Sequence, residues 1–190
     1  MAPGETEMST RAEAHIEDLY AVPENAKAEI INGELVLMSP TGDAPNTAAT
    51  EILVSLHGHA KRTKSGRAYS DNAGFKVDLP NRKSFSLDVA FHTGKRTKME
   101  FLEGAPVFAV EVRSAADYGP KAELAIARKR ADYFAAGTLV VWDVDLLNPD
   151  VIKSYDAEDP DRPTVYRRGD IAKAESAVPG WEFAVDGLFQ

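Results

Sequence analysis

Two apolar runs near the middle of the chain predict strands that each carry one carboxylate. The runs span Ser86–Phe91 and Pro106–Ser114 and are rich in β-branched and aromatic residues, a composition typical of strands. Asp88 interrupts the first run and Glu111 the second. Because acidic side chains are rarely buried unless they are paired or bind a metal, neighbouring strands here would direct both carboxylates to one divalent cation. The alternative is that each carboxylate faces water at a strand end.

The residues after Glu111 predict a strand–helix–strand unit. Arg113 follows Glu111 by two positions, so strand alternation places both side chains on the same face. Helical periodicity then runs from Lys121 to Ala136, and a further apolar run covers Thr138–Val144. This order is typical of parallel strands joined by a crossover helix. We therefore expect an α/β (α+β) fold with a central mixed sheet flanked by helices.

Capping and turn patterns predict the remaining elements. Thr10 and Glu13 form a capping-box pattern that begins a short helix ending near Tyr20. Asn32-Gly33 is a type I′ turn sequence within a hairpin over Glu29–Met38. A second helix is expected over residues 46–61, and short strands over residues 67–70, 74–79, 151–155, 164–167 and 182–185. We expect residues 1–9 to be disordered and residues 10–190 to form a single domain, because no repeat or long linker divides them.

The composition excludes several classes of protein. The chain has 190 residues, of which 44% are hydrophobic, and it contains no cysteine, which excludes a disulfide framework and a thiolate metal site. No apolar run approaches the roughly 18 residues of a membrane span, and the acidic N-terminus is unlike a signal peptide. We therefore expect a cytoplasmic protein without a membrane partner.

The charge distribution bears on nucleic-acid binding. The net charge of −8 is the wrong sign for general affinity to nucleic acid. Three local clusters of cations are exceptions that either contact phosphates or form ordinary solvated surface. The clusters are Lys61, Arg62, Lys64 and Arg67; Lys95, Arg96 and Lys98; and Arg128, Lys129 and Arg130.

The order and spacing of several short motifs resemble the PD-(D/E)XK nuclease superfamily, and more closely its restriction endonuclease-like Uma-two family. The resemblance covers roughly Thr10 to the C-terminus. The motifs are Glu29–Leu35, Met38-Ser39-Pro40, Asp88-Val89-Ala90, Glu111–Ser114, Lys129-x-x-x-Tyr133-x-x-x-Gly137, Val141–Asp145, and the closing Val178–Trp181 with Leu188-Phe189. The resemblance implies a restriction-endonuclease-like fold.

The resemblance also implies roles for these residues. Asp88 and Glu111 would hold Mg²⁺, for which Mn²⁺ is a substitute, and the carbonyl of Val112 is a third candidate ligand. Most of the superfamily has a lysine two positions after the glutamate, where this chain has Arg113, and an arginine cannot act as a base. In the Uma-two family the lysine lies on the following helix, which matches Lys129, so Arg113 becomes a supporting or phosphate-contacting residue. Without the resemblance, Lys129 would be an ordinary exposed helix lysine.

Glu29 matches the early acidic position of the family. It would complete the metal site through a water, orient Lys129, or serve only as a cross-strand charge in the hairpin. Tyr133 and Trp142 are interpreted as core aromatics. The chain departs from the family pattern at Asn46, a position where the family often has a histidine. The role of that histidine is open.

Two functions follow from these residues. The first is a Mg²⁺-dependent endonuclease that hydrolyses DNA phosphodiester bonds; hydrolysis of another phosphate ester would use the same residues. The alternative is a non-catalytic member of the fold that binds nucleic acid or a protein partner, which the net negative charge favours. The resemblance further implies a homodimer, since a two-fold symmetric enzyme presents one site to each strand of a duplex.

Overall fold

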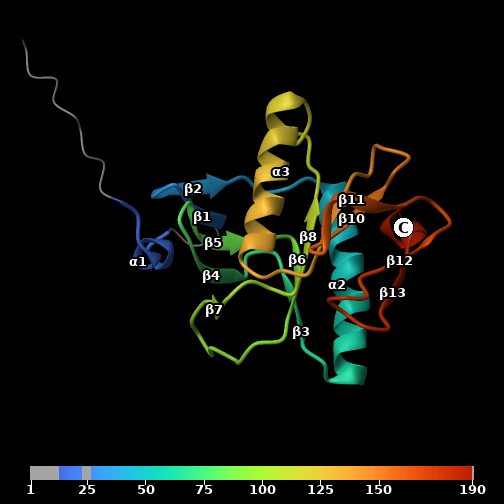
Figure 1. Ribbon diagram of the computed structural model, residues 1–190, viewed down its shortest axis with the longest axis horizontal. Coiled ribbons are helices and arrows are strands. Elements are labelled where there is room, and N and C mark those ends of the chain that lie inside the picture. The colour runs from blue at the N-terminus through green and yellow to red at the C-terminus, as the bar shows by residue number, and fades with distance from the viewer. Residues whose placement is uncertain (1–12, 23–26, 190) are drawn as a thin grey trace, which may run out of the picture.

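The computed structural model describes residues 13–22 and 27–189, which fold into α/β layers (Figure 1). The six-stranded sheet has the order β11 (Asp159–Tyr166), β10 (Ile152–Asp156), β9 (Val140–Val144), β8 (Phe108–Val112), β6 (Val89–His92), β3 (Arg67–Ser70). The five-stranded sheet has the order β2 (Glu34–Met38), β1 (Lys27–Ile31), β5 (Arg82–Ser86), β4 (Gly74–Leu79), β7 (Leu102–Glu103). The other elements are α1 (Ile16–Tyr20), α2 (Asp43–Thr63), α3 (Pro120–Ala135), β12 (Ile171–Lys173), β13 (Glu182–Ala184) and the 3-10 helix η1 (Val185–Phe189).

The six-stranded sheet confirms the predicted mixed sheet and its crossover. β8 and β9 are parallel and are joined by α3, whereas β6 runs antiparallel to β8. The hairpin of β1 and β2 is also confirmed, with positive φ angles of 51° at Asn32 and 72° at Gly33 that a type I′ turn requires. None of the helices in the described residues has the length and apolarity of a membrane-crossing segment.

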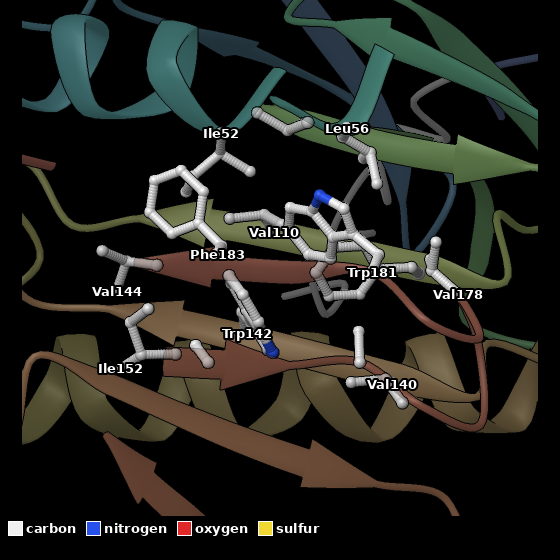
Figure 2. Packing of buried hydrophobic residues seen from close by; sticks show 14 of the residues in the cluster. Ile52, Leu56, Val110, Val140, Trp142, Val144, Ile152, Val178, Trp181 and Phe183 are labelled. Atoms are coloured by element: carbon white, nitrogen blue, oxygen red, sulfur yellow. The ribbon is translucent and has the colours of Figure 1, made fainter. Parts of the chain in front are cut away.

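Strand alternation divides the core into two layers. Val110 on β8 belongs to the cluster under α2, while Ala109 belongs to the cluster with Tyr133 of α3. Figure 2 shows the first cluster, in which Ile52 of α2 lies with Val110 and Trp181. Because successive side chains point to opposite faces, Glu111 follows Ala109 onto the α3 side of the sheet.

The strand predicted over Ser86–Phe91 is wrong as one continuous element. β5 ends at Ser86 and β6 begins at Val89, and the two strands belong to different sheets. The chain crosses between the sheets at Leu87-Asp88, where Leu87 is buried in the cluster of the α3 side. An apolar run has the same pattern in either sheet, so the pattern could not indicate the crossing.

Other boundaries also differ from the predictions. Residues 13–15 are not helical, and α1 begins after His15, whose N–H donates to Asp18 Oδ2 at 2.7 Å; Thr10 lies outside the described residues, as do residues 1–9. α2 begins at Asp43 rather than Asn46, because Pro45 is tolerated in a first turn. It ends at Thr63, and the next residue, Lys64, supplies a left-handed cap with its φ of 56°. The strands at 82–86, 102–103 and 171–173 were not predicted.

Candidate active site

A cavity of about 580 Å³ opens on the α3 side of the six-stranded sheet. Its wall combines one side of α3, the end of β8, the start of β1, the end of β2 and the loop at residues 39–42 that precedes α2. The charged side chains on this wall include Lys27, Asp71, Asp88, Glu111, Arg113 and Lys129. The crossing between the two sheets and the end of a parallel strand therefore meet at one depression.

Asp88 is held at the crossing by the strand that carries Glu111. Its Oδ2 accepts a hydrogen bond from the Val112 N–H at 2.8 Å. Asp88 lies on a bend just before β6, and Glu111 is the penultimate residue of β8. Both side chains line the cavity, so the structure brings together the two carboxylates that the sequence pattern singled out.

Glu111 makes two close contacts with α3. Lys129 Nζ lies 2.8 Å from Glu111 Oε1, and the Tyr133 hydroxyl donates to the same oxygen. Lys129 and Tyr133 reach it together because residues four apart share a helix face. Burial raises the pKa of Glu111 above its usual value, Lys129 opposes the shift and Asp88 adds to it. Burial also raises the pKa of Tyr133, so its hydroxyl keeps its proton and acts as a donor.

Lys129 bridges two carboxylates. Its Nζ lies 3.1 Å from Glu29 Oε1 in addition to its contact with Glu111. Burial lowers the pKa of Lys129, but the negative charges of Glu111 and Glu29 outweigh burial and hold that pKa above its ordinary value. The ammonium group therefore remains charged at neutral pH.

Glu29 is fully buried behind Lys129. Its Oε1 also accepts from the Ser86 N–H at 2.9 Å, and its Oε2 accepts from Arg82. Arg82 in turn pairs with Asp132 of α3, with Arg82 Nε 2.8 Å from Asp132 Oδ2. The residue opposite Glu29 in the hairpin is Val36, so the geometry favours an orienting role for Glu29 over a cross-strand charge pair.

Arg113 also reaches the cavity wall, but carboxylates outside the Asp88–Glu111 pair hold its guanidinium. Its Nε and Nη2 each lie 2.7 Å from an oxygen of Asp143, and the same group pairs with Glu123 of α3. The hydrogen bonds to Asp143 are the main cause of a raised pKa at Arg113. The side chain of Arg113 is only 7% exposed.

Lys27 and Asp71 are two residues of the cavity that the sequence reading did not single out. Lys27 Nζ lies 2.7 Å from Asp71 Oδ1 and 3.3 Å from Asp88 Oδ1. Burial lowers the pKa of Lys27, but the charges of Asp88 and Glu111 together with the contact to Asp71 hold that pKa above its ordinary value. Lys27 precedes Glu29 by two positions, so alternation along β1 was a signal that could have indicated it. Asp71 follows β3 in a turn and carried no such signal.

Among the remaining sequence candidates, Arg130 also lines the cavity, whereas Asn46 and the first two cation clusters lie outside it. Asn46 is exposed in the first turn of α2. Arg130 stacks over the Tyr155 ring, 3.7 Å from its centroid. The first two cation clusters meet at a second cavity of about 730 Å³, which lies at the end of β3 and β6 remote from Asp88. The cations on its wall are Lys61, Lys64, Arg67, Arg96 and Lys98.

A family model described as "Putative restriction endonuclease", named Uma2, matches residues 14–186. The chain belongs to the Uma2 family. This confirms the resemblance drawn from the motifs. No match was found among the curated proteins.

A solved structure extends the comparison to the fold. The chain resembles the crystal structure of a "putative nuclease belonging to DUF820" from Anabaena variabilis ATCC 29413, with a TM-score of 0.71 and 15% sequence identity. The match covers 91% of this chain and 96% of that chain. Together with the mixed sheets, it shows that this Uma2 chain has a restriction-endonuclease-like α/β fold.

The donor set of the Uma2 site suits a hard divalent cation. Carboxylate and carbonyl oxygens are the ligands that Mg²⁺ and Mn²⁺ prefer. Within residues 13–22 and 27–189, no three His, Cys, Asp or Glu side chains lie together as a ready metal cage. The protein would therefore supply Asp88, Glu111 and a carbonyl, for which Val112 remains the prediction, because Mg²⁺ usually keeps several waters.

The charge balance of the site supports the same ligand. Ion pairs and hydrogen bonds connect five carboxylates and three cations at the site. Two negative charges therefore remain uncompensated when every group is ionised. A divalent cation would neutralise that excess. The carboxylates are Asp71, Asp88, Glu111, Glu29 and Asp132, and the cations are Lys27, Lys129 and Arg82.

Proposed function

We propose that this Uma2 chain is a Mg²⁺-dependent endonuclease that hydrolyses phosphodiester bonds in DNA. One observation carries the proposal: Asp88, Glu111 and Lys129 come from three separate segments and line a single cavity, with Lys129 Nζ 2.8 Å from Glu111 Oε1. Two acidic oxygen donors beside a charged lysine are the groups that metal-assisted phosphodiester hydrolysis uses. Family membership supports nuclease chemistry.

Asp88 and Glu111 would hold the ion, and the protein fixes both carboxylates in advance. The Val112 N–H orients Asp88, and the Tyr133 hydroxyl orients Glu111. When bound, Mg²⁺ would polarise the phosphate and lower the pKa of a water. Prior fixation matters because a displacement of about 1 Å in a reacting group can cost roughly a hundredfold in rate.

Lys129 would stabilise the negative charge that builds on the attacked phosphate. Its raised pKa keeps it protonated, so its role is that of a fixed positive charge rather than a general base. Such a charge accelerates a reaction when it is held where charge develops. Glu29 and Arg82 would support it from behind, since Glu29 is anchored by Arg82 and by the Ser86 N–H.

DNA is the proposed substrate because the family is described as a restriction endonuclease family. The cations that meet at the second cavity are local exceptions to the net charge of −8, and such groups favour phosphate contacts. We also propose that residues 10–190 act as one domain and that the chain works as a homodimer. Light scattering at micromolar concentration would contradict the dimer if it gave the mass of a monomer.

Cleavage of supercoiled plasmid tests the proposal. We expect nicking or linearisation with Mg²⁺ or Mn²⁺ and none with EDTA, and we expect Asp88→Asn and Glu111→Gln each to abolish it. Asp161→Asn, an exposed site on β11, is the matched control and should cleave like the parent. Cleavage that persists in Asp88→Asn would contradict the assignment. Duplex binding in Ca²⁺ without cleavage in Mg²⁺ or Mn²⁺ would support the non-catalytic alternative.

A further inference from the structure

Lys27 is a cation already in place at the proposed metal site. It begins β1, and its side chain is 15% exposed on the cavity wall. Its Nζ contacts two carboxylates that come from different parts of the fold. Asp71 lies in the turn between β3 and β4, and Asp88 lies at the crossing between the sheets.

The two oxygens of Asp88 have different partners. Oδ2 accepts the Val112 N–H at 2.8 Å, and Oδ1 lies 3.3 Å from Lys27 Nζ. An ion shared between Asp88 and Glu111 needs an oxygen of Asp88, and Oδ1 is the one that the main chain does not bind. An ammonium group and a divalent cation repel each other at such short range, so the two cannot share Oδ1 in the present geometry.

Lys27 is held unequally by its two partners. The contact with Asp71 is 2.7 Å and the contact with Asp88 is 3.3 Å. The shorter contact is the stronger one, so Lys27 can leave Asp88 while it remains paired with Asp71. The side chain of Asp71 is 46% exposed, which leaves it room to follow the ammonium group.

We propose that Lys27 is the resident counter-ion of the metal-free site and competes with the divalent cation for Asp88. The inference rests on the proposed function, because it takes Asp88 as a metal ligand. Before metal binds, Lys27 offsets the repulsion between Asp88, Asp71 and Glu111. Metal binding moves the ammonium group off Asp88 Oδ1 and leaves it with Asp71. Lys27 thus sets the affinity of the site for its ion.

The test is Mn²⁺ binding, measured by calorimetry and by electron paramagnetic resonance, on the full chain without DNA. We expect Lys27→Met to bind Mn²⁺ at least about tenfold more tightly than the parent, because one like charge next to the ion is removed. Lys27→Gln is a second variant that keeps a polar group, and it should shift affinity in the same direction. Lys83→Met, on β5 where Lys83 pairs with the exposed Asp78, is the matched control for charge removal outside the cavity lining and should leave affinity near that of the parent.

Replacement of Asp71 distinguishes direct competition between Lys27 and the metal ion for Asp88 from a general effect of charge on metal binding. Asp71→Asn should weaken Mn²⁺ binding strongly in the parent, since Lys27 then turns fully to Asp88. The same change should have a much smaller effect in the Lys27→Met background. Equal effects in both backgrounds would overturn the inference, because a general field acts regardless of Lys27.

The remaining outcomes separate this inference from the proposed function. Mn²⁺ binding that is lost in Asp88→Asn but unchanged or weaker in Lys27→Met and Lys27→Gln would overturn the competition and leave the nuclease proposal standing. Absence of Mn²⁺ binding in the parent and in both Lys27 variants would overturn both. Binding that emerges only after Lys27 is replaced would support the inference in its strongest form.

Discussion

Lys129 and Arg113 line the same cavity, and each is paired with two carboxylates. The Lys129 pairing includes Glu111, which faces the proposed metal position, and the lysine also contacts the buried Glu29. The Arg113 pairing joins the residue after β8 to Asp143 of β9 and Glu123 of α3. Position in sequence would favour Arg113, which stands two residues after the glutamate, but contact with Glu111 favours Lys129. The comparison teaches that spacing from the acid does not by itself decide which cation lies against the oxygens of that acid.

The largest effect should come from breaking the Arg113 cluster. Arg113→Ala leaves Asp143, which is 4% exposed, without its cation. Removing one member of a buried ion pair costs about 3–5 kcal/mol of stability, so melting should fall by roughly 10 °C in a chain of this size. The folded fraction at low temperature should still bind Mn²⁺ and cleave. Unchanged melting together with lost cleavage would reverse the roles assigned to the two cations.

Lys129→Ala should act on the reaction instead. We expect roughly a hundredfold loss in plasmid cleavage, by analogy with the loss of one charge-stabilising donor, while Mn²⁺ binding persists because Asp88 and Glu111 remain. Lys121→Ala, an exposed lysine on the same helix, is the control and should cleave like the parent. Parental rates in Lys129→Ala would make Arg113 the leading candidate.

Tyr133→Phe should sharpen the comparison with a smaller change. The substitution removes the hydroxyl that donates to Glu111 but keeps the ring, which stacks on Phe85 with centroids 4.3 Å apart. We expect a loss of about 1 kcal/mol in unfolding free energy and roughly tenfold slower cleavage from a less fixed Glu111. Single-turnover cleavage and urea unfolding measure the two effects. A cleavage rate equal to the parent would restrict Tyr133 to packing.

The smallest effect concerns pH and the exposed member of the Arg113 cluster. The hydrogen bond from Arg113 lowers the pKa of Glu123 below its usual value, so the folded pKa lies below the unfolded one. The pair therefore adds stability above about pH 4.3, the unfolded value, and loses it as the pH falls through the lowered folded pKa. Urea unfolding of Glu123→Gln should show a deficit at neutral pH that vanishes in acid. A deficit independent of pH would indicate a packing effect instead.

The local elements were predictable because their signals lie within short stretches of sequence. The Asn32-Gly33 turn, the crossover over α3 and the positions of Asp88 and Glu111 follow from local patterns and a family resemblance. The contact of Lys129 with Glu111 needed the resemblance, since spacing alone favoured Arg113. Their catalytic roles remain predictions.

The unpredicted features depend on contacts between distant segments. The crossing at Leu87-Asp88 depends on strand pairings with β1, β4, β3 and β8, which no apolar run encodes by itself. Lys27 contacts Asp71 because the strand pairing of the five-stranded sheet places the start of β1 beside the turn that follows β3. The guanidinium of Arg113 is directed to Asp143 by the parallel register that places Asp143 opposite Glu111. Each of these outcomes is set by tertiary pairing rather than by neighbours in the chain.

The stacked tryptophans give the molecule an optical signature. The chain contains two tryptophans, and the rings of Trp142 and Trp181 lie 5.2 Å apart at 29°. Indoles at this separation couple their strong electronic transitions, so the far-ultraviolet circular dichroism should carry an exciton couplet that disappears on unfolding. Both side chains belong to the cluster on the α2 side of the sheet, opposite the cavity. Their fluorescence emission should therefore report whether that layer of the core is folded. The emission should change little when an ion enters the site.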